Sequence, residues 1–211
     1  MLFLRRVLAG VSSLTRGAFI LASWLTVALV LLTVQQVVSR YFFQSSSIAM
    51  QELQWHLFGF IITLSMAHAL DKNGHVRVDI LSNRFGAKLR RGIHTIGFFL
   101  LIPLSIALTY FGILDVLHSR SYESPVPPNF YSELLATKDS LLFSILSPIE
   151  EILRATLLVG EGSSDAGGLE ARWIIRAAFP LGMTLLALQS ISLFLRSLFP
   201  SLNKAEEYSW I

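Results

Sequence analysis

The chain has 211 residues, of which 53% are hydrophobic and 15% are charged. Soluble domains average about 45–50% apolar and about 25% charged residues, so this composition favours a protein that is solvated by lipid. The absence of cysteine excludes disulfides, thiol catalysis and Cys-ligated clusters, and the small formal net charge of +3 does not support nucleic-acid binding.

Four long stretches of the sequence contain no Asp, Glu, Lys or Arg. Each is close to the ~20 residues with which a helix crosses a ~30 Å hydrocarbon core. We therefore predict an all-α integral membrane fold in which residues 1–211 form a single membrane domain. The four predicted transmembrane helices cover about residues 17–39, 50–70, 92–115 and 176–197.

The segment before the first span has apolar residues at helical spacing and basic residues off that stripe. Leu4, Leu8, Val11 and Leu14 form the stripe. This pattern predicts a short helix lying in the membrane surface, although the flank of a signal anchor would look similar.

The basic residues of the connections predict the orientation. Residues 71–91 contain six Lys or Arg against two Asp, whereas residues 115–176 contain nine acidic and five basic residues. Because Lys and Arg gather on the cytoplasmic side, we predict that both termini and the 72–91 segment are cytoplasmic. The insertion over residues 120–170 then faces the periplasm of a Gram-negative cell.

Polar and small residues mark one face of the second predicted helix. Glu52 lies in its first turn, where the helix dipole favours an acid or where a contact with another helix or subunit is possible. His56, Gly59 and Thr63 follow at spacings of three and four residues and share one side of the helix. Small residues on one face allow close approach of a neighbouring helix, and Gly182 in the fourth span gives the same signal.

The stretch "ALDKNGHVRVDIL" (69–81) follows the second span. Asp71, Asn73 and Gly74 resemble the start of a calcium loop, but the twelfth position is Ser82, where a glutamate is required. We predict instead that residues 72–91 form a cytoplasmic interfacial helix. Its lipid head-group contacts are predicted at Arg84, Lys88 and Arg91.

The insertion between the third and fourth spans combines extended, helical and small-residue segments. Its middle predicts one or two amphipathic helical pieces broken near Pro148, and "EGSSDAGG" (161–168) predicts a flexible linker. We expect a small structured cap that lies on the membrane or against a partner, because its apolar residues would otherwise face water.

Catalytic and cofactor patterns are weak. The sequence contains no nucleophile elbow, zincin motif or P-loop, so we predict neither an enzyme nor a bound cofactor or metal. The uncharged spans argue against a transporter that works alone. A haem-binding anchor of a redox complex is the alternative, with His56, His68, His94 and His118 as its candidate ligands.

Two motif regions resemble the small membrane subunit (DctQ-type) of TRAP transporters, the tripartite ATP-independent periplasmic transporters. "GHVRVDIL" (74–81) and the basic residues up to Arg91 resemble the family's run after the second helix. "FPLGMTLLALQSISLFLRSL" (179–198) resembles its fourth helix, and Glu52 and Arg40 also fit.

The resemblance implies a scaffold subunit in the bacterial inner membrane. It would stabilise a large DctM-type elevator subunit and help to dock a periplasmic substrate-binding protein, in a sodium-coupled transporter for organic acids. Membrane lipids are the other predicted partner. The residues predicted to contact other subunits are Glu52, His56, Gly59, Thr63, His75, Arg77, Asp79, Gly182 and Gln189.

Overall fold

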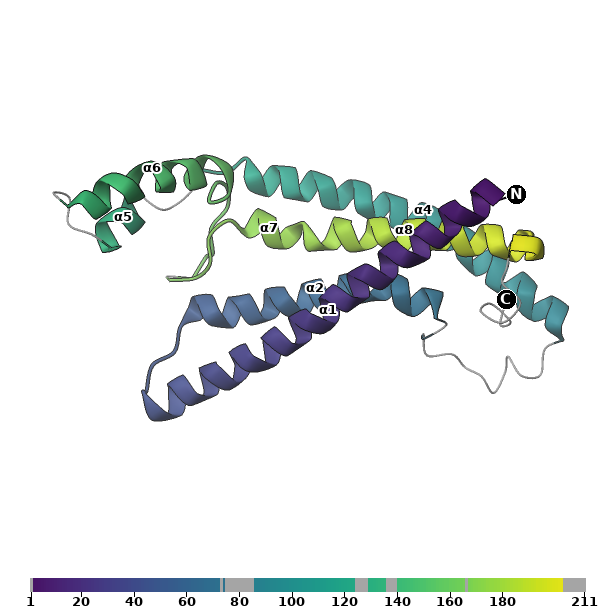
Figure 1. Ribbon diagram of the computed structural model, residues 1–211, viewed down its shortest axis with the longest axis horizontal. Coiled ribbons are helices and arrows are strands. Elements are labelled where there is room, and N and C mark those ends of the chain that lie inside the picture. Colours follow the sequence, from purple (N-terminus) through teal and green to yellow (C-terminus); the bar gives the residue numbers. More distant parts are fainter. Residues whose placement is uncertain are drawn as a thin grey trace. The chain divides into compact units, whose positions relative to one another are not determined.

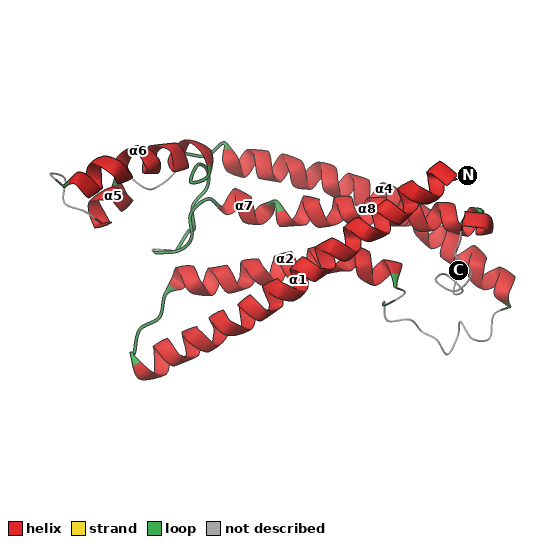
Figure 2. Cartoon of the chain, in the orientation of Figure 1, coloured by secondary structure: helices red, strands yellow, loops and turns green. Residues whose placement is uncertain are grey.

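The protein is built from helices, and its described residues contain no strand (Figures 1 and 2). Residues 2–72, 74, 86–123, 129–135, 140–165 and 167–202 are described by the computed structural model. The elements are α1 (Leu2–Phe42), α2 (Ile48–Asp71), α4 (Ala87–Arg120), α5 (Phe130–Leu135), α6 (Leu141–Thr156), α7 (Arg172–Arg176), α8 (Ala178–Leu198) and the 3-10 turn η1 (Pro200–Leu202).

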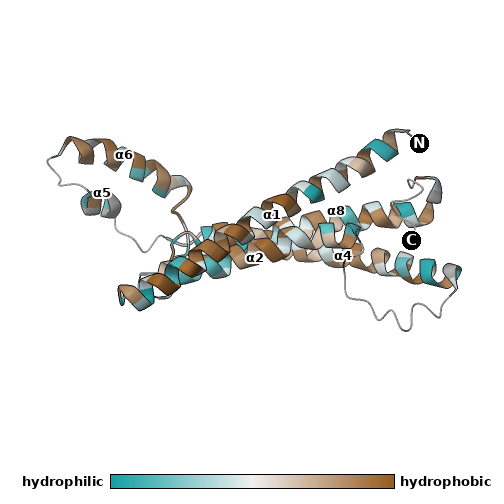
Figure 3. Cartoon of the chain, turned by 60° about the horizontal axis from the view of Figure 1, so that its bottom comes forward, coloured by the Kyte–Doolittle hydropathy of each residue, from teal (hydrophilic) through white to brown (hydrophobic). Residues whose placement is uncertain are grey.

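The all-α membrane fold is confirmed. Within the described residues, four helical segments are long and apolar enough to cross a membrane. Apolar residues dominate the middle of the long helices in Figure 3, as a hydrocarbon environment requires. The segments are Phe3–Phe42, Ile48–Asp71, Lys88–Arg120 and Arg172–Leu198.

The first and third spans belong to longer helices than predicted. The N-terminal segment forms no separate surface helix, because α1 runs without a break from Leu2 to Phe42. The buried side chains of Leu8 and Thr15 pack this first part of α1 within the fold, which overrides the surface-helix pattern. Similarly, residues 87–91 form the first turns of α4, while most of the predicted 72–91 helix lies outside the described residues.

The chain divides into two compact units. The first unit contains residues 1–29, 57–111 and 178–211, and α8 is its most buried helix. Phe98 of α4 and Leu193 of α8 form a small apolar core, against which Leu70 and Phe194 pack. Because α8 also contacts α1 and α2 through polar side chains, it organises this unit.

The second unit contains residues 30–56 and 112–177. In it, α6 is one continuous helix through Pro148, so the predicted break at this proline is wrong. Pro148 has no backbone N–H, so α6 lacks one hydrogen bond. The N-cap of the helix offsets this loss, because the Ser140 side chain accepts a hydrogen bond from the Phe143 backbone N–H. Buried Glu150 links α6 to α5 by accepting the Ser132 backbone N–H at 2.7 Å.

Candidate functional site

Polar side chains at the end of α2 form a buried cluster in the first unit, which we call the Asp71 cluster (Ser12, Thr15, Asp71 and Gln189). Gln189 Nε2 donates to Asp71 Oδ1 at 2.5 Å, and Ser12 Oγ donates to the same oxygen at 3.4 Å. Thr15 Oγ1 donates to Gln189 Oε1 at 3.4 Å, which orients the amide nitrogen toward the carboxylate. The cluster therefore joins α1, α2 and α8.

Burial makes this cluster costly to disrupt. Asp71 is 2% exposed, and Gln189 and Thr15 are fully buried. A buried carboxylate needs hydrogen-bond donors or a counter-charge, and Lys72 Nζ lies 3.6 Å from Asp71 Oδ2 at the cluster's outer side. This satisfied network can hold three helices in one register.

The predicted close approach of small residues occurs between α2 and α8. A Cβ atom added at Gly182 would lie 2.5 Å from Thr63 Cβ and 2.7 Å from the Thr63 carbonyl oxygen. Only glycine fits there, since the obstructing atoms include backbone. Gly59, one turn earlier on α2, has open space around its Cβ position.

A second polar contact fixes the insertion to the start of α2, within the second unit. Ser163 Oγ donates to one carboxylate oxygen of Glu52, and the Leu169 backbone N–H donates to the other at 2.6 Å. The loop is closed by a 2.9 Å bond from Ser163 N to Leu169 O. Ser163 and Leu169 therefore have defined contacts, where the sequence predicts a flexible linker over residues 161–168.

The same loop is attached to the end of α4 and to α7. Arg176 bridges Asp115 and Glu161, with nitrogen–oxygen distances of 2.8 and 2.6 Å. Gly160 adopts a φ of 97°, and a Cβ atom there would lie 2.7 Å from the Ser119 carbonyl oxygen. Glycine is required at this turn both by the positive φ and by the close approach.

Histidines lie in separate contacts. His68 packs against Phe19 with ring centroids 4.8 Å apart, His94 stacks on Phe98 at 6.2 Å, and a His118 ring nitrogen lies 3.0 Å from the Tyr122 hydroxyl. Within the described part of the chain, no group of three or more His, Cys, Asp or Glu could hold a metal ion.

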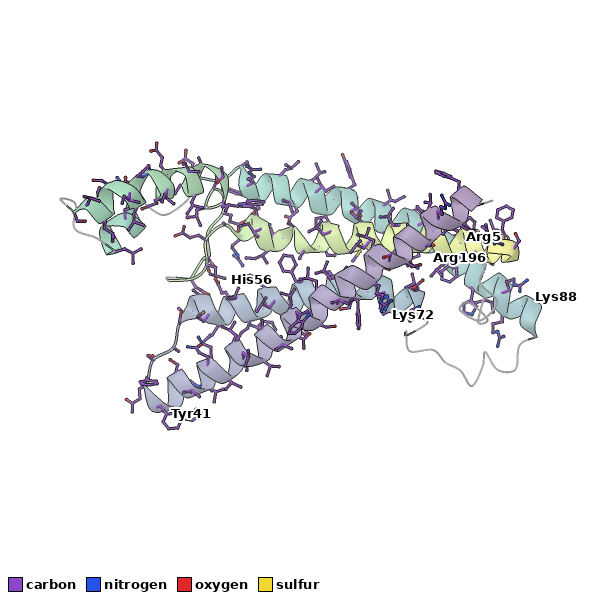
Figure 4. All side chains as sticks on the ribbon, in the orientation of Figure 1. Arg5, Tyr41, His56, Lys72, Lys88 and Arg196 are labelled. Atoms are coloured by element: carbon purple, nitrogen blue, oxygen red, sulfur yellow. The ribbon has the colours of Figure 1, made fainter. Side chains whose placement is uncertain are left out.

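Basic residues gather at one end of the first unit. Figure 4 shows Arg5 near the start of α1, Lys72 after α2, Lys88 at the start of α4 and Arg196 near the end of α8. Lys88 and Arg91 are exposed, as a contact with lipid head groups requires, but that contact is untested. The structure does not describe His75, Arg77, Asp79 or Arg84.

A comparison with protein families matches residues 29–132 to the family described as "Tripartite ATP-independent periplasmic transporters, DctQ component". The chain belongs to the DctQ family. It is a multi-pass membrane subunit of the bacterial inner membrane. No curated protein matches the chain.

The DctQ match covers Glu52 and Asp71 but ends before α8. The hydrogen-bond partners of these two acids, Gln189 for Asp71 and Leu169 for Glu52, come from later in the chain, outside the matched residues. Gln189 and Gly182 were predicted to contact other subunits. Within this chain Gln189 is fully buried and Gly182 is packed against Thr63. Their contact with other subunits stays a prediction.

Sequence reasoning missed the partners of the two acidic residues. Ser12, Thr15 and Ser163 gave no signal, because isolated hydroxyl residues are common in membrane helices and loops. The one usable sign was an acid directly at the end of an apolar helix. From the sequence, Asp71 resembles only a possible calcium ligand.

Proposed function

We propose that this DctQ subunit is the fixed scaffold of a sodium-coupled, binding-protein-dependent transporter for organic acids. In this role it stabilises a large DctM-type elevator subunit and helps to dock a periplasmic substrate-binding protein. The observation that carries the proposal is the family match over residues 29–132.

The hydrogen bonding of the polar side chains inside the spans supports the scaffold role. Hydroxyl side chains in the middle of the spans bond to the backbone of their own helix in several places: Ser105 donates to the Leu101 carbonyl and Thr184 donates to the Pro180 carbonyl, both at 2.7 Å. Groups that carry ions across a membrane must be available to the ion. The substrate and sodium sites therefore belong to the large subunit.

The distribution of buried residues also fits a partner. In the most apolar part of the Arg172–Leu198 span, 56% of the residues are buried within the chain. The corresponding share is only 6% for Phe3–Phe42 and 17% for Lys88–Arg120. The last span is thus enclosed by its own chain, whereas α1 and α4 present apolar faces to lipid or to another subunit. Gly59, with open space around it, offers a point of close approach on α2.

Reconstitution tests this proposal. The tagged chain should co-purify with a larger membrane protein encoded beside it, and vesicles should take up an organic acid only with both membrane subunits, the binding protein and a sodium gradient. Full transport by the large subunit without this chain would refute the scaffold role. Uptake that does not depend on sodium would refute the coupling.

The proposed orientation, with both termini cytoplasmic, has its own test. Because the sequence contains no cysteine, one introduced thiol reports its side of the membrane without background. A membrane-impermeant maleimide added to intact spheroplasts should label Ser47→Cys in the turn after α1 and leave Ser201→Cys after α8 unlabelled. Labelling of Ser201→Cys but not of Ser47→Cys would show that the chain has the opposite orientation.

A further inference from the structure

A cleft opens where α1 ends and α2 begins, within the second unit. It has a volume of about 330 Å³, and its walls come from the last turns of α1 and the first turns of α2. The hydrogen bonds given above for Glu52 and for the Asp71 cluster involve no residue that lines this cleft. The residues that line it include Thr33, Gln36, Val37, Arg40, Gln54 and Trp55.

The charge of the cleft favours an anion. Arg40 is its one charged lining residue, and no carboxylate lines it. Among the described residues, the contact found for the guanidinium is with the neighbouring Tyr41 ring, 5.4 Å from its centroid. Arginine offers several donors and no acceptor. Gln36 Nε2 donates to Gln35 Oε1 and Gln54 Nε2 donates to the Leu32 carbonyl, and each amide group has a second N–H for a ligand. An acceptor-rich oxyanion such as a phosphate matches this set.

The position of the cleft favours an amphipathic molecule. Trp55 and Tyr41 are 74% and 72% exposed beside it, and Figure 4 shows Tyr41 at the end of α1. Exposed aromatic residues at the end of a membrane helix lie at head-group depth. Val37 and Trp55 form the apolar wall of the cleft. Exposed Val30 and Val34 precede Val37 on α1 at helical spacing and extend this apolar surface. Acyl chains can follow this surface while the head group occupies the cleft.

We propose that this cleft binds the phosphate of a phospholipid head group, with Arg40 as its charged ligand. The Arg40 guanidinium pairs with the phosphate oxygens, the glutamine amides donate to the remaining oxygens, and Trp55 covers the junction with the acyl chains. A free phosphate or organic-acid anion shares the charge but gains nothing from the apolar wall. The site does not depend on the proposed transport function.

Fluorescence quenching of Trp55 tests the site directly. The full-length chain, with its three other tryptophans replaced by Phe, is purified in detergent and titrated with brominated phosphatidylglycerol. Quenching should saturate, and Arg40→Gln should weaken the apparent affinity by at least about tenfold, since it removes charge-assisted hydrogen bonds. Arg16→Gln, an exposed arginine in the first half of α1, is the matched control and should leave the affinity unchanged.

Two results would overturn the proposal. One is equal quenching curves for the parent protein and Arg40→Gln. The other is inorganic phosphate competing at the same concentration as the lipid, which would assign the cleft to a free anion. Circular dichroism and thermal unfolding of both variants establish that the helices are intact, so a loss of quenching reports binding.

Discussion

Removing the Gln189 amide should expose the energetic role of the Asp71 cluster. In Gln189→Leu the volume is nearly retained, but the 2.5 Å bond to the carboxylate is lost. Asp71 keeps the Ser12 hydroxyl at 3.4 Å and Lys72 at 3.6 Å. The carboxylate is 2% exposed, so water cannot replace the missing donor without opening the packing of α1, α2 and α8.

The expected loss follows from these contacts. A hydrogen bond to a charged group contributes about 1.5–3 kcal/mol, and breaking a buried charge pair outright costs about 3–5 kcal/mol. Because Asp71 keeps other partners, among them Ser12 and Lys72, we expect the free energy of unfolding to fall by about 2–3 kcal/mol. For a chain of this size each kcal/mol shifts Tm by about 2–4 °C, so Tm should fall by roughly 4–12 °C.

Thermal unfolding in one detergent, followed by circular dichroism, measures this shift. Gln35→Leu, the same substitution at an exposed position of α1, should change the stability by less than about 0.5 kcal/mol. The double variant Asp71→Leu/Gln189→Leu removes the charge together with its donor and should be more stable than Gln189→Leu alone. Equal melting of Gln189→Leu and the control would refute the reasoning, as would a double variant that loses the sum of both single effects.

The remaining predictions concern α2 and the loop attached to it. Gly182→Ala places a methyl group against the backbone of α2 at Thr63 and should lower Tm by several degrees. Gly59→Ala, in open space, should leave Tm unchanged or raise it, because it removes a glycine from a helix. An unchanged Tm for Gly182→Ala would contradict this packing. Glu52→Leu removes the acceptor of the Leu169 amide, whose hydrogen exchange should quicken about 10- to 100-fold in mass-spectrometric measurements. Unchanged exchange at Leu169 would show that the loop is held without Glu52.

The helical fold could be predicted in some detail. Each span can be recognised from its own stretch of sequence, because about 20 apolar residues without a charge have few alternatives to a membrane helix. The ends were less predictable. The α1 segment before residue 17 and the α6 segment through Pro148 are continuous helices, since packing and capping outweigh local patterns of polarity or a single lost hydrogen bond.

The contacts of the polar residues could be predicted only in part. The sequence singled out Glu52 and Gln189, and both are engaged in specific hydrogen bonds. Their partners were not foreseen, because each partner lies more than 100 residues away in the chain. A spacing rule relates residues on one helix but says nothing about which neighbouring helix they face.

The all-helical membrane fold and its four spans follow from the amino-acid sequence alone, and the sequence motifs resemble the family that the comparison identifies. Hydropathy depends on the composition of each segment alone, so these properties need no knowledge of distant contacts. Tertiary structure alone decided that Asp71 is bound by Gln189 and that Glu52 holds the 163–169 loop. Those pairings depend on how each helix is rotated about its axis and on which helix lies beside it, and burial then makes the paired arrangement the one of low energy.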